Sequence, residues 1–238
     1  MSRAPADPLA GTAAAVASAG AVTMLHDTAP TILQCDDFFS AVEAQEIITA
    51  AGKPSPAAQA QFGRTGGVVW LAHDHSARGA RRSVPCHPSM CFLWVPEPGC
   101  LCAAVGAVVS RISTLVGIPS EHAEAMQVAF YDPGQSYAAH YDAFEPAHGG
   151  PEAAGGVEGF GNRLVSALGY LTEHPGAGGE TEFTRLGLLV QPQVGRLLVF
   201  SNIDSAGSRF VDSVHSARPL APGAERKWIF NVWFRGTS

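Results

Sequence analysis

Three residues in the second half of the chain have the types and spacing of a mononuclear iron site. His140 and Asp142 are separated by one residue, and His215 lies much further along the chain. An iron ion that activates oxygen takes two histidines and one carboxylate on one side of an octahedron, which leaves three positions open. Alternate residues of a strand share a face, so a single strand can present both His140 and Asp142. We therefore expect these three residues to bind a metal ion.

Other clusters compete with this assignment, because the chain has nine histidines and an isolated H-x-D triplet is a weak signal. His122-Ala123-Glu124 is one rival, and His73-Asp74-His75 is another. A zinc site is a third alternative, with the candidate ligands His73, His75, Cys86, His87 and Cys91. Their spacing matches no standard zinc module. Context favours His140, which follows the run at 131–137, and His215, which precedes a basic strand.

The end of the chain reads as a strand with two unlike faces. Strict alternation predicts one face that is wholly apolar, made of Trp228, Phe230, Val232 and Phe234. The other face is expected to carry Lys227, Ile229, Asn231, Trp233 and Arg235. A cation, an amide and an indole are an unusual set for a plain core. We therefore expect the second face to line a site.

Composition limits the classes of protein that fit. The chain has 238 residues, 46% hydrophobic and 15% charged, which suits one domain with a sizeable core. The formal net charge of −6 and the absence of a long basic run argue against nucleic acid as a partner. No apolar run is long enough for a membrane span, so no membrane association is expected. Five cysteines without paired C-x-x-C spacing indicate reduced thiols, and we expect a cytoplasmic protein.

The order of elements predicts an α+β protein in which helices precede a strand-rich core. Residues 1–30 are rich in small side chains and are expected to be a flexible or loosely packed extension, with a targeting segment as the alternative. Residues 31–238 are expected to be one domain, with helical support over 31–123 and a double-stranded β-helix, or jelly roll, over 124–238. Helices are predicted at 40–51, where Ser40 and Glu43 make a capping box, and at 99–116. A strand at 68–71 and a long loop lie between these helices. Short apolar runs predict strands at 125–131, 163–172, 180–183, 187–190, 195–201, 210–216 and 226–235.

Five sequence motifs follow one another through the expected core. The first two are E-A-M-Q-V-A-F-Y-D-P-G-Q-S-Y-A-A-H-Y-D at 124–142 and N-R-L-V-S-A-L-G-Y-L at 162–171. The other three are G-G-E-T-E-F at 178–183, G-R-L-L-V-F at 195–200, and D-S-V-H-S-A-R-P-L-A-P-G at 212–223 followed by K-W at 227–228. In this order they resemble the prolyl 4-hydroxylase branch of the Fe(II)/2-oxoglutarate-dependent dioxygenases, and the resemblance covers about 115 residues, nearly the whole expected core.

The resemblance implies a role for eight residues. His140, Asp142 and His215 match the iron ligands of the family. Lys227 matches the lysine that binds the distal carboxylate of 2-oxoglutarate, and Tyr131 and Thr181 match residues that hydrogen-bond the same cosubstrate. Arg163 and Trp233 match positions that face the peptide substrate. The family usually places its lysine two residues closer to the second histidine, which makes Arg226 and Arg218 alternative carboxylate binders.

The function implied is hydroxylation of a prolyl residue in a peptide or protein, with Fe(II), 2-oxoglutarate and O2, and with ascorbate as a candidate addition. The keto acid is converted to succinate and carbon dioxide, and the Asp142 carboxylate favours hydroxylation over halogenation. Two alternatives stay open. One is a hydroxylase of a free amino acid or another small molecule, and the other is a non-enzymatic jelly roll that binds a metal or ligand.

Overall fold

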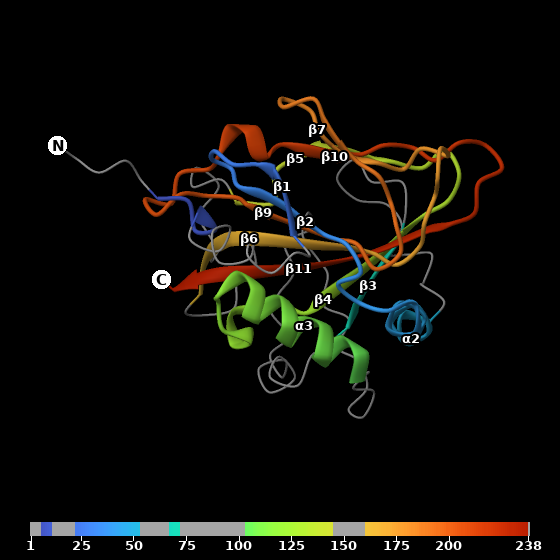
Figure 1. Cartoon of the computed structure of the whole chain (residues 1–238), viewed down its shortest axis with the longest axis horizontal. Helices are drawn as coiled ribbons and strands as arrows, with labels where there is room; N and C mark the ends of the chain where they lie inside the picture. The colour runs from blue at the N-terminus through green and yellow to red at the C-terminus, as the bar shows by residue number, and fades with distance from the viewer. Residues whose placement is uncertain (1–5, 11–21, 53–66, 72–102, 145–159, 238) are drawn as a thin grey trace, which may run out of the picture.

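The structure, a computed structural model, describes residues 6–10, 22–52, 67–71, 103–144 and 160–237 (Figure 1). The predicted long loop and the candidate zinc cluster at 73–91 lie outside these ranges. Within the described ranges, apolar residues alternate along the strands, and the apolar side of each strand is the side that other elements cover. The strands form two antiparallel sheets, and two longer helices lie on the outer face of one of them.

The larger sheet has seven strands in the order β1-β2-β9-β6-β11-β4-β3, and each neighbouring pair is antiparallel. The strands are β1 (Val22–His26), β2 (Ile32–Cys35), β3 (Gly67–Leu71), β4 (Met126–Tyr131), β6 (Phe160–Tyr170), β9 (Leu197–Ser201) and β11 (Lys227–Thr237). Strand β11 lies between β4 and β6 near the middle of this sheet, so both of its edges are hydrogen-bonded.

The smaller sheet has four strands in the order β5-β10-β7-β8. These are β5 (Tyr137–His140), β7 (Thr181–Phe183), β8 (Leu188–Val190) and β10 (His215–Ala217). One apolar cluster joins the inner faces of both sheets and includes Tyr131, Tyr170, Phe183, Phe200 and Ile229. Face-to-face packing of two sheets buries one side of each strand, which produces the alternation seen in the sequence.

Helices α2 (Ala41–Ala51) and α3 (Ala103–Val116) cover the opposite face of the larger sheet (Figure 1). Helix α2 begins with the predicted capping box, in which Ser40 and Glu43 bond each other's backbone amides. A second apolar cluster joins the two helices to Phe230, Val232 and Phe234 of β11. The prediction of two unlike faces for this strand is therefore confirmed. None of the helices in the described ranges has the length and apolar character needed to cross a bilayer.

The structure differs from the predicted organisation near the N-terminus. Residues 22–26 are not a loose extension but form β1, which pairs with β2. Leu9 is fully buried in the helix-side cluster, and the Asp7 carboxylate accepts hydrogen bonds from Thr31 and Ser201. The boundary expected at residue 30 therefore falls inside the larger sheet. Residues 31–123 also contain β2, which was not predicted, and β3, which confirms the strand predicted at 68–71.

Gly169 of β6 gives a test of how tightly the helix-side core is packed. A Cβ at this position would overlap the ring of Phe230, which packs on Phe39. We expect Gly169→Ala to lower the free energy of unfolding by about 1–3 kcal/mol, as overpacking does. Gly106 in α3 is the control, because a Cβ there meets nothing within 4 Å and alanine favours a helix by about 0.5–1 kcal/mol. Urea unfolding should show a lower free energy of unfolding for Gly169→Ala and a higher one for Gly106→Ala. A Gly169→Ala protein as stable as wild type would contradict this packing.

Candidate metal centre

Strand pairing in the smaller sheet brings the predicted ligands together. His140, at the end of β5, is the direct cross-strand partner of His215 at the start of β10. Asp142 lies two residues beyond His140, past the end of β5, so the two ligands do not share one strand as predicted. Its Oδ1 is 3.5 Å from Nε2 of His140, and its Oδ2 is 3.8 Å from Nε2 of His215. One ligand atom from each residue lies within 4.8 Å of the others.

Backbone carbonyls set the orientation of both imidazole rings. Nδ1 of His140 lies 2.9 Å from the carbonyl oxygen of Ala138, and Nδ1 of His215 lies 2.9 Å from that of Ser213. A carbonyl oxygen can only accept, so Nδ1 carries the proton in each ring. Nε2 is then left with a lone pair, which is the arrangement found in metal-binding histidines.

The electrostatics of the cluster suit a metal ion. Burial lowers the pKa of His215 to about 4, and the charge of His140 acts in the same direction. Burial tends to raise the pKa of Asp142, but the positive charges that His215 and His140 carry when they are protonated lower it more strongly. The pKa of Asp142 therefore lies well below its usual range. A neutral imidazole and an ionised carboxylate are the forms that bind metal, and two histidines with one carboxylate fit Fe(II).

The competing H-x-E triplet has other partners. Glu124 accepts two hydrogen bonds from the Arg163 guanidinium, and His122 Nδ1 lies 3.2 Å from the carbonyl oxygen of Arg235. Among the described residues, His140, Asp142 and His215 form the group whose ligand atoms converge. The other rival, His73-Asp74-His75, lies outside the described residues.

The predicted cosubstrate residues come from both sheets, with Lys227 and Tyr131 on the larger sheet and Thr181 on the smaller one. Lys227 is only 1% exposed, its Nζ donates to the Gly179 carbonyl at 2.7 Å, and it lies 4.6 Å from the centre of the Tyr131 ring. Thr181 is also buried, and its Oγ1 accepts a hydrogen bond from Tyr170 at 2.7 Å. Tyr170 was not predicted from the sequence. It is a polar residue in an apolar run, and alternation places it on the same strand face as Leu168.

The two alternative cations lie elsewhere. Arg226 makes a bidentate ion pair with Asp132, at 2.7 and 3.0 Å, and its side chain is 41% exposed. Arg218 is 47% exposed and lies 3.9 Å from Glu182. Of the three candidates, Lys227 alone is buried between the sheets. The geometry therefore favours Lys227 as the carboxylate binder despite its longer spacing from His215.

Arg163 and Trp233 lie together beside the metal ligands. The Arg163 guanidinium is 3.8 Å from the Trp233 ring centre, and its Nη1 is 3.4 Å from the backbone oxygen of Asp142. Its Nε and Nη2 donate to Glu124 at 2.8 and 2.7 Å. The acidic partner of Arg163 is thus Glu124. Contact with substrate stays a prediction for both residues.

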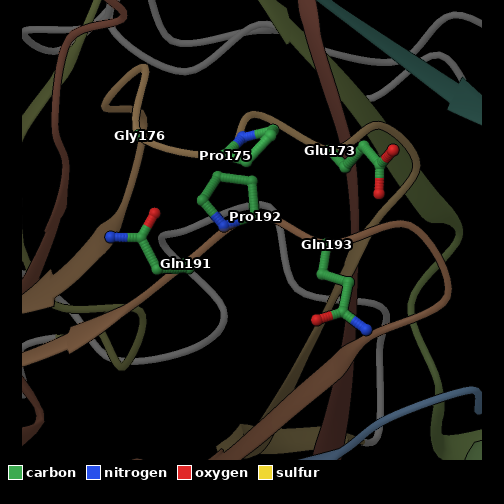
Figure 2. A pocket seen from close by; sticks show the side chains of 6 residues that line it. All are labelled: Glu173, Pro175, Gly176, Gln191, Pro192 and Gln193. Atoms are coloured by element: carbon green, nitrogen blue, oxygen red, sulfur yellow. The ribbon is translucent and has the colours of Figure 1, made fainter.

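A surface hollow lies apart from this cluster. It is formed by two loops and lined by Glu173, Pro175, Gly176, Gln191, Pro192 and Gln193. Figure 2 shows Pro175 and Pro192 beside each other, with the side chains of Glu173 and Gln193 directed away from them. The lining contains none of the eight residues predicted to act in the site.

Comparison with known proteins agrees with this geometry. Residues 126–235 match the family model of the 2OG-Fe(II) oxygenase superfamily, a range that includes all eight predicted residues. The chain is 30% identical over 147 residues to probable prolyl 4-hydroxylase 9 of Arabidopsis thaliana, covering 56% of this chain and 48% of that protein. It is 33% identical over 129 residues to human prolyl 4-hydroxylase subunit alpha-1, covering 54% and 23%. The chain therefore spans about half or less of these relatives.

Solved structures show the same fold. A viral collagen prolyl hydroxylase from Paramecium bursaria Chlorella virus-1 matches with a TM-score of 0.57 and 23% identity, over 87% of this chain and 96% of that chain. A prolyl-4-hydroxylase from Pseudomonas putida matches with a TM-score of 0.55 and 19% identity, over 97% and 100%. At these identities the likeness supports the architecture of the two sheets.

Proposed function

We propose that this protein is an Fe(II)- and 2-oxoglutarate-dependent dioxygenase. Residues 126–235 form a 2OG-Fe(II) oxygenase domain with prolyl 4-hydroxylase homologues, which is the basis of this proposal. Its two sheets are then the halves of a jelly roll. Its substrate is a prolyl residue in a peptide or protein. The observation that carries the proposal is the fully buried Lys227. It contacts Tyr131 of the apolar cluster between the sheets, and the Phe183 and Phe200 rings of the same cluster contact His215.

Each residue of the cluster has a chemical task in this proposal. His140, Asp142 and His215 would hold Fe(II), which supplies the oxygen chemistry that couples decarboxylation of 2-oxoglutarate to hydroxylation of a C–H bond. Lys227 binds the distal carboxylate of the keto acid through a charge-assisted hydrogen bond. Tyr131 and Thr181 hydrogen-bond the same molecule. The apolar side chains between the sheets keep water from the reacting atoms.

A peptide suits the surroundings of the site better than a free amino acid does. A free amino acid needs an acidic partner for its ammonium group, and the nearby carboxylates already have partners. Glu124 binds Arg163, Glu180 accepts from Gln191 at 3.0 Å, and Glu182 lies near Arg218. A peptide needs a flat apolar surface and a donor for its carbonyl groups. Trp233 and Arg163 are proposed to supply these.

We expect faster coupled succinate formation with a proline-rich peptide than with free proline or free lysine at the same concentration. The reason is that the peptide can use Trp233 and Arg163 and leaves no ammonium group without a partner. Succinate release and product mass are measured in parallel with Fe(II), O2 and ascorbate present. Faster coupled turnover on a free amino acid would overturn the peptide assignment and leave the oxygenase assignment intact.

A further inference from the structure

A chain of buried hydrogen bonds leads from the carboxylate ligand into the core. Ser166 Oγ donates to Oδ2 of Asp142 at 2.6 Å, and Asn202 Nδ2 donates to Ser166 Oγ at 2.8 Å. Ser166 lies on β6, Asn202 directly follows β9, and the exposed fractions of the two residues are 2% and 0%. A length of 2.6 Å is typical of a hydroxyl that donates to an ionised carboxylate. The protein thus fixes one oxygen of the proposed ligand.

Proton counting gives this chain of hydrogen bonds a direction. A serine hydroxyl has one proton, and Ser166 gives it to a carboxylate that can only accept. The oxygen of Ser166 must therefore accept from the NH2 group of Asn202, which turns the amide oxygen of Asn202 the other way. That Oδ1 atom is buried and has no hydrogen-bond donor among the described residues. A buried oxygen without a hydrogen bond lowers the free energy of unfolding. This orientation of the Asn202 side-chain amide therefore calls for an explanation.

We propose that Ser166 and Asn202 are positioning residues that make Asp142 bind the metal through Oδ1 alone. The inference rests on the proposed function, because it presumes an ion held by the three ligands. With Oδ2 bonded to Ser166, the carboxylate is held in one rotation. Oδ1 then lies 3.5 Å from Nε2 of His140, close to the separation of about 3 Å that two ligands of one ion adopt, while Oδ2, the oxygen bonded to Ser166, lies 3.8 Å from Nε2 of His215. Single-oxygen ligation keeps a coordination position open for the cosubstrate and O2.

The chain contains a matched control for this proposal. Ser201 is also fully buried in the larger sheet, and its Oγ donates to the Asp7 carboxylate at 2.7 Å and accepts from the Thr31 amide at 3.0 Å. It therefore has the same pattern of donor and acceptor as Ser166, but its carboxylate partner is not in the metal cluster. Replacing Ser201 by alanine should lower the free energy of unfolding about as much as replacing Ser166 does, without changing the binding of the metal ion.

The experiment compares Ser166→Ala and Ser201→Ala by titration with Co(II), a spectroscopic substitute for Fe(II). We expect Ser166→Ala to lose about 10- to 100-fold in metal affinity, as changes behind a metal ligand do. Its Co(II) absorption should change in shape, because Asp142 becomes free to bind through both oxygens. Ser201→Ala should keep both the affinity and the spectrum of wild type. If Ser166→Ala does not fold, Ser166→Cys retains the volume with a weak donor and should show the same changes.

Four results would decide against these roles or against their premise. Wild-type affinity and spectrum in Ser166→Ala would overturn the positioning role. Equal losses in Ser166→Ala and Ser201→Ala would do the same, since they would reflect a general loss of stability. Failure of the wild-type protein itself to bind Co(II), or undiminished binding in His140→Ala, would instead contradict the proposed metal site. Failure of the positioning role and failure of the proposed function are therefore distinguishable.

Discussion

Replacing any one of the three proposed ligands by alanine is expected to abolish metal-dependent turnover and leave a folded protein. His140→Ala, Asp142→Ala and His215→Ala each remove one of the three proposed ligands that converge among the described residues. The loss of metal affinity should exceed the roughly 10- to 100-fold typical of changes behind a ligand. Folding should survive, because the two apolar clusters are built from other residues. Succinate formation and circular dichroism measure the two effects separately.

The control for these variants is His122→Ala, which alters the rival triplet. His122 lies near the carbonyl oxygen of Arg235 and away from the three converging ligands, so turnover should persist. A ligand variant with near wild-type turnover would show that the residue concerned does not bind the ion. Lost turnover in His122→Ala with an intact fold would return that triplet to consideration.

The second large effect is expected on the cosubstrate. Lys227→Ala should raise the concentration of 2-oxoglutarate needed for half-maximal turnover far more than it changes metal affinity. The charge-assisted bond of a buried cation is worth about 1.5–3 kcal/mol, or roughly 10- to 150-fold in affinity. Lys227→Met retains most of the apolar stem and should show the same loss, which separates the charge from packing. Titration of 2-oxoglutarate at saturating Fe(II) measures the effect.

Arg226→Ala is the matched control, because it removes the neighbouring cation on the other side of the strand. The ion pair of Arg226 with Asp132 is solvent-exposed, and such pairs contribute about 0–1 kcal/mol. Its 2-oxoglutarate requirement should therefore stay close to that of wild type. If Lys227→Ala had the 2-oxoglutarate requirement of wild type and Arg226→Ala had a raised one, Arg226 and not Lys227 would be the carboxylate binder.

The parts of the site that the sequence could predict are those with local periodicity. Alternation along 227–235 placed Lys227 and Trp233 on the inner face, and the structure buries both there. The capping box identified the start of α2 for a similar reason, since its two residues are three positions apart. Both patterns lie within a single element, so they do not depend on how distant segments pair.

Features that depend on long-range pairing were missed. Strand β1 is only partly buried, and it pairs in an irregular register with β2, which itself pairs with β9. Asn202 reaches Ser166 from the position after β9, across 36 positions of sequence. Ser166, Leu168 and Tyr170 share one face of β6. From this pattern the two polar residues could have been predicted as candidates for the site. Glu124 as the partner of Arg163 had no local signal.

The measurement that tests the central proposal most directly is succinate release by the purified protein. With Fe(II), 2-oxoglutarate, O2, ascorbate and a proline-rich peptide, we expect succinate to form together with a peptide heavier by one oxygen atom. Both products should vanish when Fe(II) is omitted and in the His140→Ala variant. A wild-type protein that binds Fe(II) but releases no succinate, with or without peptide, would contradict the enzyme assignment. It would favour the alternative of a metal-binding jelly roll without catalysis.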